Sequence, residues 1–243
     1  MDELDFSGKS VLVVGGSSGI GNGIARAFLD RGASVHVFGT RASAADYAGE
    51  GSDLDGLQYQ QLDVTDDAAL ARYTPPFDRL DVLVLSQGLV LYRRAEFNMA
   101  EFRRVTDVNL MSVMACAIKF HDMLAQSHGS LIVISSVAAF LATKGNPAYN
   151  ASKAGVTALT RNLAQAWASE GIRVNAIAPG LVDTKLTRVT TGNPQRLEAT
   201  LGRIPLGRLG TIEEMAGVTL FLASPLSSYM IGQTLLVDGG RLL

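Results

Sequence analysis

The sequence predicts an α/β fold, a single Rossmann-type doubly wound domain whose seven-stranded parallel sheet carries helices on both faces. Short runs rich in β-branched residues alternate along the chain with longer segments of helical periodicity, which is the pattern of a parallel sheet with crossover helices. Several of these runs are apolar at nearly every position, as strands buried on both faces must be. The chain has 243 residues, a length that suits one α/β unit, so we expect one domain over residues 1–243.

The elements follow each other at the spacing of βαβ units, and Thr211 with Glu214 forms a capping box for the last helix. The expected strands are Ser10–Val14, Ser34–Phe38, Leu57–Leu62, Asp81–Leu85, Ser130–Ser135, Arg173–Ala178 and Thr234–Val237. The expected helices are Gly19–Arg31, Asp66–Tyr73, Met99–Ala125, Ala148–Ser169 and Ile212–Ala223.

One long stretch, Asp183–Leu209, fits neither period. It contains four Arg, one Lys, three Gly and two Pro. We interpret residues 185–209 as a candidate lid over a site, although a solvated connection would have the same composition.

Composition and charge exclude several classes of protein. The chain carries 21 Lys and Arg against 23 Asp and Glu, a net charge of -2, which provides no basic field for nucleic acid or an anionic membrane. The first ten residues are acidic and lack the apolar core of a secretory signal, and apolar runs such as Leu131–Ala142 are too short to span a bilayer. Cys116 is the single cysteine, so no intramolecular disulfide forms, and we expect a cytoplasmic protein.

A glycine-rich turn lies between the first strand and the first helix. Gly15, Gly19 and Gly21 allow a tight turn and a close approach to a pyrophosphate, whose charge the N–H groups and dipole of the following helix stabilise. Glycine also serves ordinary strand-to-helix turns, but the preceding strand, the following helix and the βαβ spacing favour a dinucleotide site.

The second strand ends without the acidic residue that would bind the adenosine ribose. Thr40 and Arg41 stand there instead. A guanidinium and a hydroxyl can bind a 2'-phosphate, which a carboxylate repels. NADP(H) is therefore the preferred cofactor, with NAD(H) as the alternative if Arg41 faces solvent, and no metal ion is expected.

Tyr149 and Lys153 lie four residues apart at the start of a predicted helix, which puts both on one face. A nearby ammonium favours the phenolate and lowers the pKa of a tyrosine, so the pair can donate and accept a proton. Ser136, at the end of a buried strand, can bring its hydroxyl to the same crevice and polarise a carbonyl oxygen. Each residue alone has an ordinary structural explanation, but together with a dinucleotide turn they favour catalysis.

From Gly8 to Gly240 the chain resembles the classical short-chain dehydrogenases/reductases. Beyond the residues named above, the motifs that carry the resemblance are Leu62-Asp63-Val64, Val108-Asn109, Ser135-Ser136, Pro179-Gly180 and Val237-Asp238-Gly239-Gly240. The resemblance implies an NAD(P)-dependent alcohol dehydrogenase or ketone reductase with the catalytic tetrad Asn109, Ser136, Tyr149 and Lys153. Tyr149 would exchange a proton with the substrate oxygen, Lys153 would lower the pKa of Tyr149 and hold the nicotinamide ribose, and Asn109 would position a water. The implied cofactor contacts are Gly15, Ser17, Ser18, Gly19, Ile20, Gly21, Thr40, Arg41, Asp63, Val64, Gly88, Tyr149, Lys153, Pro179, Gly180, Val182 and Thr184.

Three positions depart from the family pattern. Val14 replaces a threonine, Leu85-Ser86-Gln87-Gly88 replaces Asn-Asn-Ala-Gly, and Ser18 is not the Arg or Lys of some NADP-preferring members. The resemblance therefore places a larger polar side chain, Gln87, beside the nicotinamide.

The expected substrate is a hydrophobic small molecule that carries a ketone or a secondary alcohol, because the side chains expected around the reacting carbon are mostly apolar. Gln87 and Asn146 could fix one polar group of it. These apolar side chains are Leu89, Val90, Ala138, Phe140, Leu181 and Leu186.

Two alternatives stay open. The segment Gly207–Gly240 resembles 3-oxoacyl-carrier-protein reductases, but Ser130 and Glu170 stand where such reductases present basic residues to their acidic carrier. The second alternative is a non-catalytic NADP-binding sensor, against which the intact tetrad argues. The resemblance also implies a homodimer or homotetramer, built on the helices Met99–Ala125 and Ala148–Ser169 with the C-terminal strand adding an interface.

Overall fold

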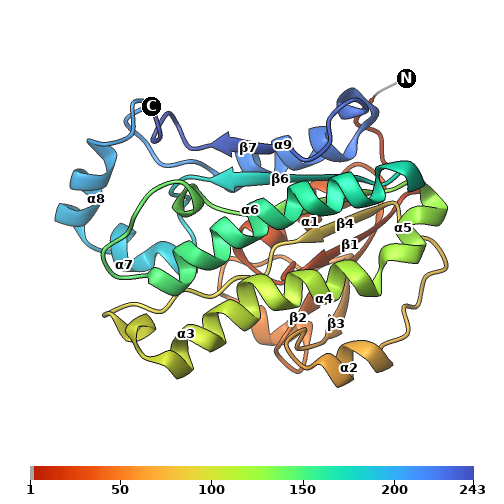
Figure 1. Ribbon diagram of the computed structural model, residues 1–243, viewed down its shortest axis with the longest axis horizontal. Helices are drawn as coiled ribbons and strands as arrows, with labels where there is room; N and C mark the ends of the chain where they lie inside the picture. Colours follow the sequence, from red (N-terminus) through yellow and green to blue (C-terminus); the bar gives the residue numbers. More distant parts are fainter. Residues whose placement is uncertain (1–2) are drawn as a thin grey trace.

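The computed structural model describes residues 3–243 as one seven-stranded, all-parallel sheet with helices on both faces (Figure 1). This confirms the predicted fold class. The strands are β1 Ser10–Val14, β2 Ser34–Gly39, β3 Gln58–Gln61, β4 Val82–Leu85, β5 Ser130–Ile134, β6 Arg173–Pro179 and β7 Thr234–Val237. The helices are α1 Gly19–Leu29, α2 Asp67–Arg72, α3 Met99–Thr106, α4 Ser112–Lys119, α5 His121–Ser127, α6 Pro147–Trp167, α7 Arg188–Thr191, α8 Pro194–Leu201 and α9 Ile212–Ala223.

The strand order is β3-β2-β1-β4-β5-β6-β7. The chain leaves β1 toward β2 on one side and later returns to β4 on the other, so the order reverses between β1 and β4. Ligands of open α/β sheets bind outside the carboxyl ends of the strands at such a reversal. The topology therefore points to the edge where Val14 pairs with Phe38 on one side and with Leu85 on the other.

Alternate residues of the strands pack into two separate cores. Val11 and Val13 of β1 point to the face covered by α1 and α9, whereas Leu12 and Val14 point to the opposite face, which α4 and α6 cover (Figure 1). All four side chains are at most 1% exposed. This double burial explains why the strand is apolar at every inner position.

The segment predicted as one helix, Met99–Ala125, is broken in two places. Residues Asp107–Met111 form a π-helical turn between α3 and α4, and such turns are frequent at functional sites. The second break is at Phe120, a fully buried residue that packs against Phe38, and there the axis bends by 53°. Neither break contains a proline, which would have marked it in the sequence. The hydrophobic periodicity alone therefore did not reveal the two breaks.

The irregular stretch Asp183–Leu209 contains two short helices, α7 and α8. Asn193 caps α8 by accepting the backbone N–H of Arg196 at 3.0 Å, and Pro194 occupies the first helical position. An asparagine followed by proline is a start signal that could have predicted this helix.

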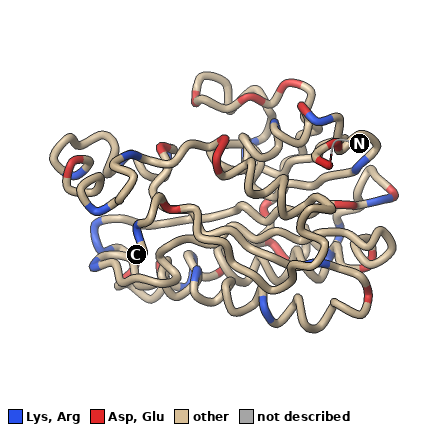
Figure 2. The backbone as a smooth tube through the Cα atoms, turned by 90° about the horizontal axis from the view of Figure 1, so that it is seen from above, with Lys and Arg blue, Asp and Glu red and all other residues tan. Residues whose placement is uncertain are grey.

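Charged residues of both signs are distributed along the length of the molecule (Figure 2). Within residues 3–243, no single helix has the length and hydropathy to cross a bilayer. The segment from the start of α3 to the end of α4 at residue 119 passes that test only when it is joined to α5 across the 53° bend.

Candidate active site

The glycine turn after β1 is built for close backbone packing. Gly15 has a φ of +75°, and its N–H donates to Phe38 O at 3.1 Å. A Cβ on Gly15 would lie 2.8 Å from Gln87 N, and one on Gly21 would lie 2.2 Å from Gly15 O. Only glycine fits either position without moving the backbone.

The first turn of α1 faces this loop with unsatisfied donors. Ser18 is the N-cap and has an extended backbone, but its side chain makes no capping bond. The first N–H groups of any α-helix have no acceptor within the helix, and the Ser18 side chain does not supply one to α1. Together with the glycine cradle, this arrangement fits the pyrophosphate of a dinucleotide.

Arg41, the predicted 2'-phosphate ligand, lies at the end of β2 and is engaged within the protein. Its guanidinium donates to Glu50 Oε2 at 2.8 Å and stacks 4.5 Å from the centre of the Tyr47 ring. The Tyr47 hydroxyl accepts the backbone N–H groups of Thr40 and Arg41 at 3.2 and 3.3 Å. The guanidinium is thus oriented at the strand end, with a carboxylate as its counter-ion.

The other predicted cofactor residues line the carboxyl edge of the sheet. Asp63 is exposed and accepts the N–H and hydroxyl of Thr65, at 3.0 and 2.7 Å, in a local turn. Val64 is buried in the core. Thr184 lies across from the turn, because a Cβ on Gly19 would contact its methyl group at 3.6 Å.

Beyond β6, three further predicted residues fix the chain entering the candidate lid. Pro179 pairs with Val237, and Gly180 is so close to the C-terminal turn that a Cβ would lie 2.8 Å from Asp238 Cα. Val182 is buried and pairs with Gly210 in an isolated bridge.

The structure brings Tyr149, Ser136 and Lys153 together. The Ser136 side chain lies close enough to the Tyr149 hydroxyl to act on the pKa of the phenol. Lys153 is 4% exposed, and its Nζ donates to Ile134 O at 2.8 Å and lies 5.7 Å from the centre of the Tyr149 ring. The ends of β5 and the start of α6 thus place a phenol, a hydroxyl and an ammonium at one point.

The pKa values of this group differ from the prediction based on spacing. Burial raises the pKa of Tyr149 to about 12, the Ser136 hydrogen bond opposes that rise, and Glu96 adds to it. Burial lowers the pKa of Lys153 to about 8. Lys153 is not among the groups that lower the pKa of Tyr149, and its Nζ donates to the Ile134 carbonyl.

Asn109 lies in the π-helical turn and is fully buried. Its Oδ1 accepts Leu89 N at 2.7 Å, and its Nδ2 donates to Leu89 O at 2.9 Å and to Ser152 Oγ at 3.0 Å. A Cβ on Gly88 would lie 3.8 Å from both Asn109 Oδ1 and Lys153 Nζ. Asn109 therefore pins the chain after β4 beside Lys153, and both of its amide hydrogens are used within the protein.

Glu96 is a site residue that sequence reasoning missed. Its carboxylate is fully buried and accepts Leu91 N at 3.0 Å, Asn146 Nδ2 at 3.3 Å and Tyr149 N at 3.0 Å. Asn146, the N-cap of α6, makes no side-chain cap of its own, so Glu96 caps this helix from another segment. The separation of 53 residues between Glu96 and Tyr149 leaves no local signal in the sequence.

Two polar residues predicted to contact substrate are already engaged. Asn146 donates to Leu91 O at 2.8 Å as well as to Glu96. Gln87 donates to Ser112 Oγ at 3.0 Å, while its Oε1 is buried without a hydrogen-bond partner in the described chain. Both amide hydrogens of Asn146 serve the fold, so the expectation that Asn146 fixes a polar group of the substrate stays a prediction that rests on Oδ1 as an acceptor.

The apolar side chains expected around the reacting carbon differ in their exposure to solvent, and their position around the phenol stays a prediction. Ala138 is buried, whereas Phe140 and Leu186 are 49% and 38% exposed. Tyr92 joins them: its hydroxyl donates to Leu186 O at 2.7 Å and so links the loop after β4 to the candidate lid. These exposed apolar surfaces are available to a hydrophobic substrate.

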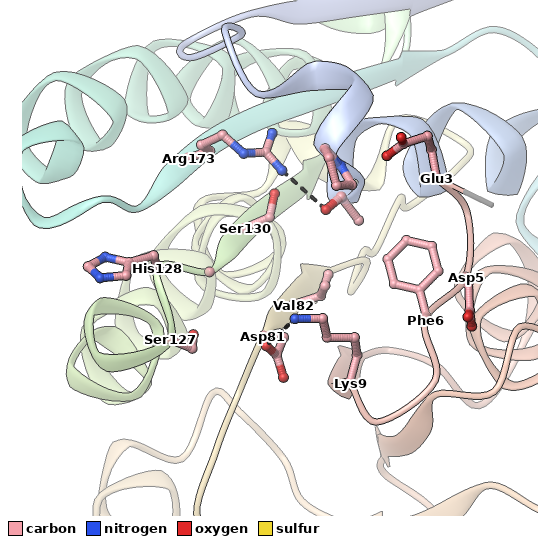
Figure 3. A pocket seen from close by; sticks show the side chains of 13 residues that line it. Glu3, Asp5, Phe6, Lys9, Asp81, Val82, Ser127, His128, Ser130 and Arg173 are labelled. Atoms are coloured by element: carbon pink, nitrogen blue, oxygen red, sulfur yellow. Dashed lines mark hydrogen bonds and ion pairs between the residues drawn. The ribbon is translucent and has the colours of Figure 1, made fainter. Parts of the chain in front are cut away.

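A cavity of about 420 Å³ lies at the opposite, amino edge of the sheet (Figure 3). Asp81 there accepts Lys9 Nζ at 3.2 Å and Arg79 NH2 at 2.7 Å. Arg173 caps the end of α9 by donating to Leu222 O at 2.8 Å and to Ala223 O at 3.1 Å. These charged side chains hold structural elements together, and none of the tetrad residues lines this cavity.

Comparison with known proteins supports the interpretation of the carboxyl edge. Residues 14–241 match the family model described as enoyl-(acyl carrier protein) reductase. The chain is 37% identical to the 3-oxoacyl-(acyl-carrier-protein) reductase FabG of Chlamydia pneumoniae, over 98% of each chain. It is also 37% identical to the cis-4-hydroxycyclohexanecarboxylate dehydrogenase of Sinomonas cyclohexanicum, over 97% of each. A solved structure described as a putative 2-deoxy-D-gluconate 3-dehydrogenase of Agrobacterium tumefaciens, with bound NADP, is similar at a TM-score of 0.88 and 33% identity, covering 100% of this chain and 99% of that one.

Proposed function

The chain belongs to the classical short-chain dehydrogenase/reductase family, and from this premise we propose that it interconverts a ketone and a secondary alcohol on a hydrophobic small molecule. It is an NAD(P)-dependent oxidoreductase. The observation that carries the proposal is the meeting of the Tyr149 phenol, the Ser136 side chain and the buried Lys153, whose Nζ lies 5.7 Å from the centre of the Tyr149 ring. The exposed apolar side chains of Phe140 and Leu186 support a hydrophobic substrate.

In the proposed reaction Tyr149 is the acid and base. Bound NADP(H) supplies or takes up the hydride. During reduction the Tyr149 phenol donates its proton to the carbonyl oxygen, and the Ser136 hydroxyl hydrogen-bonds the same oxygen and stabilises its developing charge. During oxidation the phenolate accepts the alcohol proton. Lys153 donates to Ile134 O beside the phenol and would hold the nicotinamide ribose, as the family resemblance implies.

Asn109 acts on the geometry of the site. It clamps Leu89 through both backbone groups and so fixes the turn beside Lys153. Both amide hydrogens are engaged, so only the second lone pair of Oδ1 remains for a water. We propose that Asn109 holds the chain on which the nicotinamide end rests.

NADP is the proposed preferred cofactor, with NAD as the weaker ligand. Gly15 and Gly21 with the first turn of α1 would hold the pyrophosphate, and Arg41 would bind the 2'-phosphate once it releases Glu50. The Agrobacterium tumefaciens relative is described with bound NADP, which supports this preference.

A second candidate is the reduction of a 3-oxoacyl group on a carrier protein, favoured by the 37% identity to the Chlamydia pneumoniae reductase. Ser130 is 2% exposed and donates to Leu222 O, while Glu170 pairs with His121 at 3.1 Å. Neither position offers an acidic carrier a positive charge. We therefore place free ketones and alcohols first.

The proposed assembly is a homodimer or homotetramer of single-domain subunits, with residues 185–209 as the substrate lid. Met111, directly before α4, and Ile118, near the end of α4, are each 60% exposed. Tyr229 and Leu236 are exposed near the C-terminus. Apolar surface of this kind supports association, which light scattering on the purified protein would measure. The cytoplasmic location stays a prediction.

Tyr149→Phe tests the proposed function against the sensor alternative. The variant keeps the ring and loses only the hydroxyl, so we expect turnover of a ketone panel with NADPH to fall at least about a thousandfold. Binding of NADPH, followed by nicotinamide fluorescence, should stay unchanged. Equal turnover in the variant and the wild type would exclude Tyr149 as the proton donor, and a wild type that binds NADPH without reducing any ketone would favour the sensor.

A further inference from the structure

Three charged side chains from distant segments meet beside the start of α1. Glu50 Oε2 accepts Arg41 NH2 at 2.8 Å and Lys185 Nζ at 3.1 Å. Arg41 follows β2, Glu50 lies in the turn before β3, and Lys185 is the first residue of the candidate lid. One carboxylate thus holds two cations whose positions are 144 residues apart in the chain.

The turn that carries Glu50 is anchored to α1 by a buried side chain. Asn22 is 5% exposed, donates to Asp53 O at 2.8 Å and accepts Asp53 N at 2.9 Å. Arg41 is held on the other side by its stacking on Tyr47. Buried hydrogen bonds therefore set the turn that presents Glu50, rather than the exposed ion pairs alone.

The cluster lies next to the phosphate-binding turn. Thr184, the residue before Lys185, contacts the position of a Cβ on Gly19 at 3.6 Å. The cluster of Arg41, Glu50 and Lys185 therefore lies beside the turn that we propose holds the pyrophosphate. Two cations around one carboxylate leave one net positive charge, whereas a phosphate ester carries about -1.5 to -2 and matches both cations.

We propose that Lys185 is a second cation for the 2'-phosphate of NADP and that Glu50 is the internal counter-ion the phosphate displaces. The inference rests on the proposed NADP preference. Glu50 therefore weakens the binding of NADP and leaves the binding of NAD unchanged, because only the 2'-phosphate competes with Glu50 for the two cations. It also ties the first residue of the lid to the adenosine end of the cofactor.

Calorimetry with adenosine 2',5'-bisphosphate and adenosine 5'-monophosphate isolates the 2'-phosphate. Lys185→Gln should raise the Kd for the bisphosphate about three- to tenfold and leave that for the monophosphate unchanged. Glu50→Gln should lower the Kd for the bisphosphate by a similar factor, again without effect on the monophosphate. Matched controls are Arg188→Gln and Glu198→Gln, two exposed charges of the same lid, which should change neither value.

Each result decides the inference. Unchanged bisphosphate binding in Lys185→Gln, or weaker binding in Glu50→Gln, would overturn it. Arg41→Gln separates this failure from failure of the cofactor preference: if Arg41→Gln weakens the bisphosphate and Lys185→Gln does not, only the inference fails. If wild type binds both nucleotides equally, the NADP preference itself is wrong.

Discussion

Glu96 accepts the backbone N–H of Tyr149 at 3.0 Å, across a separation of 53 residues. The carboxylate is fully buried and supplies a negative charge at the N-terminus of α6, where the helix dipole favours it. The residue that we propose exchanges the proton is thus held by a group that touches neither substrate nor cofactor.

Glu96→Gln keeps the shape of the side chain and removes its charge. The amide cannot accept all three hydrogen bonds, so we expect the free energy of unfolding in urea to fall by about 1–3 kcal/mol. Because the Glu96 charge raises the pKa of Tyr149, its loss should move the pH profile of alcohol oxidation to lower pH. A purely structural role would lower stability and leave that profile in place. Glu101→Gln, on the neighbouring helix α3, should change neither.

The two directions of the reaction should differ in their dependence on pH. With a pKa raised to about 12, the Tyr149 phenol keeps its proton at neutral pH, as reduction requires. Oxidation requires the phenolate, whose fraction grows about tenfold per pH unit below the pKa. Between about pH 5 and 7, below the pKa of about 8 of Lys153, kcat/KM for oxidation should rise steeply while that for reduction stays nearly level. Initial rates with one alcohol and ketone pair measure both; a level profile for oxidation would exclude Tyr149 as the base.

Gly21→Ala should weaken dinucleotide binding. The new Cβ would lie 2.2 Å from Gly15 O, so the turn must open and the N–H groups of α1 move away from the pyrophosphate. We expect the Kd for NADPH, from fluorescence titration, to rise at least about tenfold. Gly217→Ala in α9 is the control: its Cβ meets open space, so binding should be kept and the helix stabilised by up to about 1 kcal/mol.

Tyr92→Phe removes the hydrogen bond to Leu186 O and should loosen the lid. We expect KM for a hydrophobic ketone to rise by more than kcat falls, and proteolysis within residues 185–209 to become faster. The exposed Tyr229→Phe should behave like wild type. Unchanged proteolysis in Tyr92→Phe would show that the hydroxyl does not hold the lid.

Local patterns were sufficient to predict much of this molecule. The β1 run Ser10–Val14 is apolar at its inner positions because both faces of the strand are buried. Gly15 and Gly21 stand where backbone groups nearly touch, and Tyr149 and Lys153 share a face because four residues complete slightly more than one helical turn. Each of these requirements acts over a few residues, so the sequence shows it directly.

Tertiary structure alone decided how the site is held and charged. Glu96 reaches Tyr149, Asn109 reaches Leu89, and Glu50 joins Arg41 to Lys185 only after the chain has folded. The sequence by itself determined the fold class and the glycine-rich turn after β1 and, through the family resemblance, the residues of the proposed tetrad. The raised pKa of Tyr149 and the partners of Arg41 depend on burial and on contacts between distant segments, which no local pattern encodes.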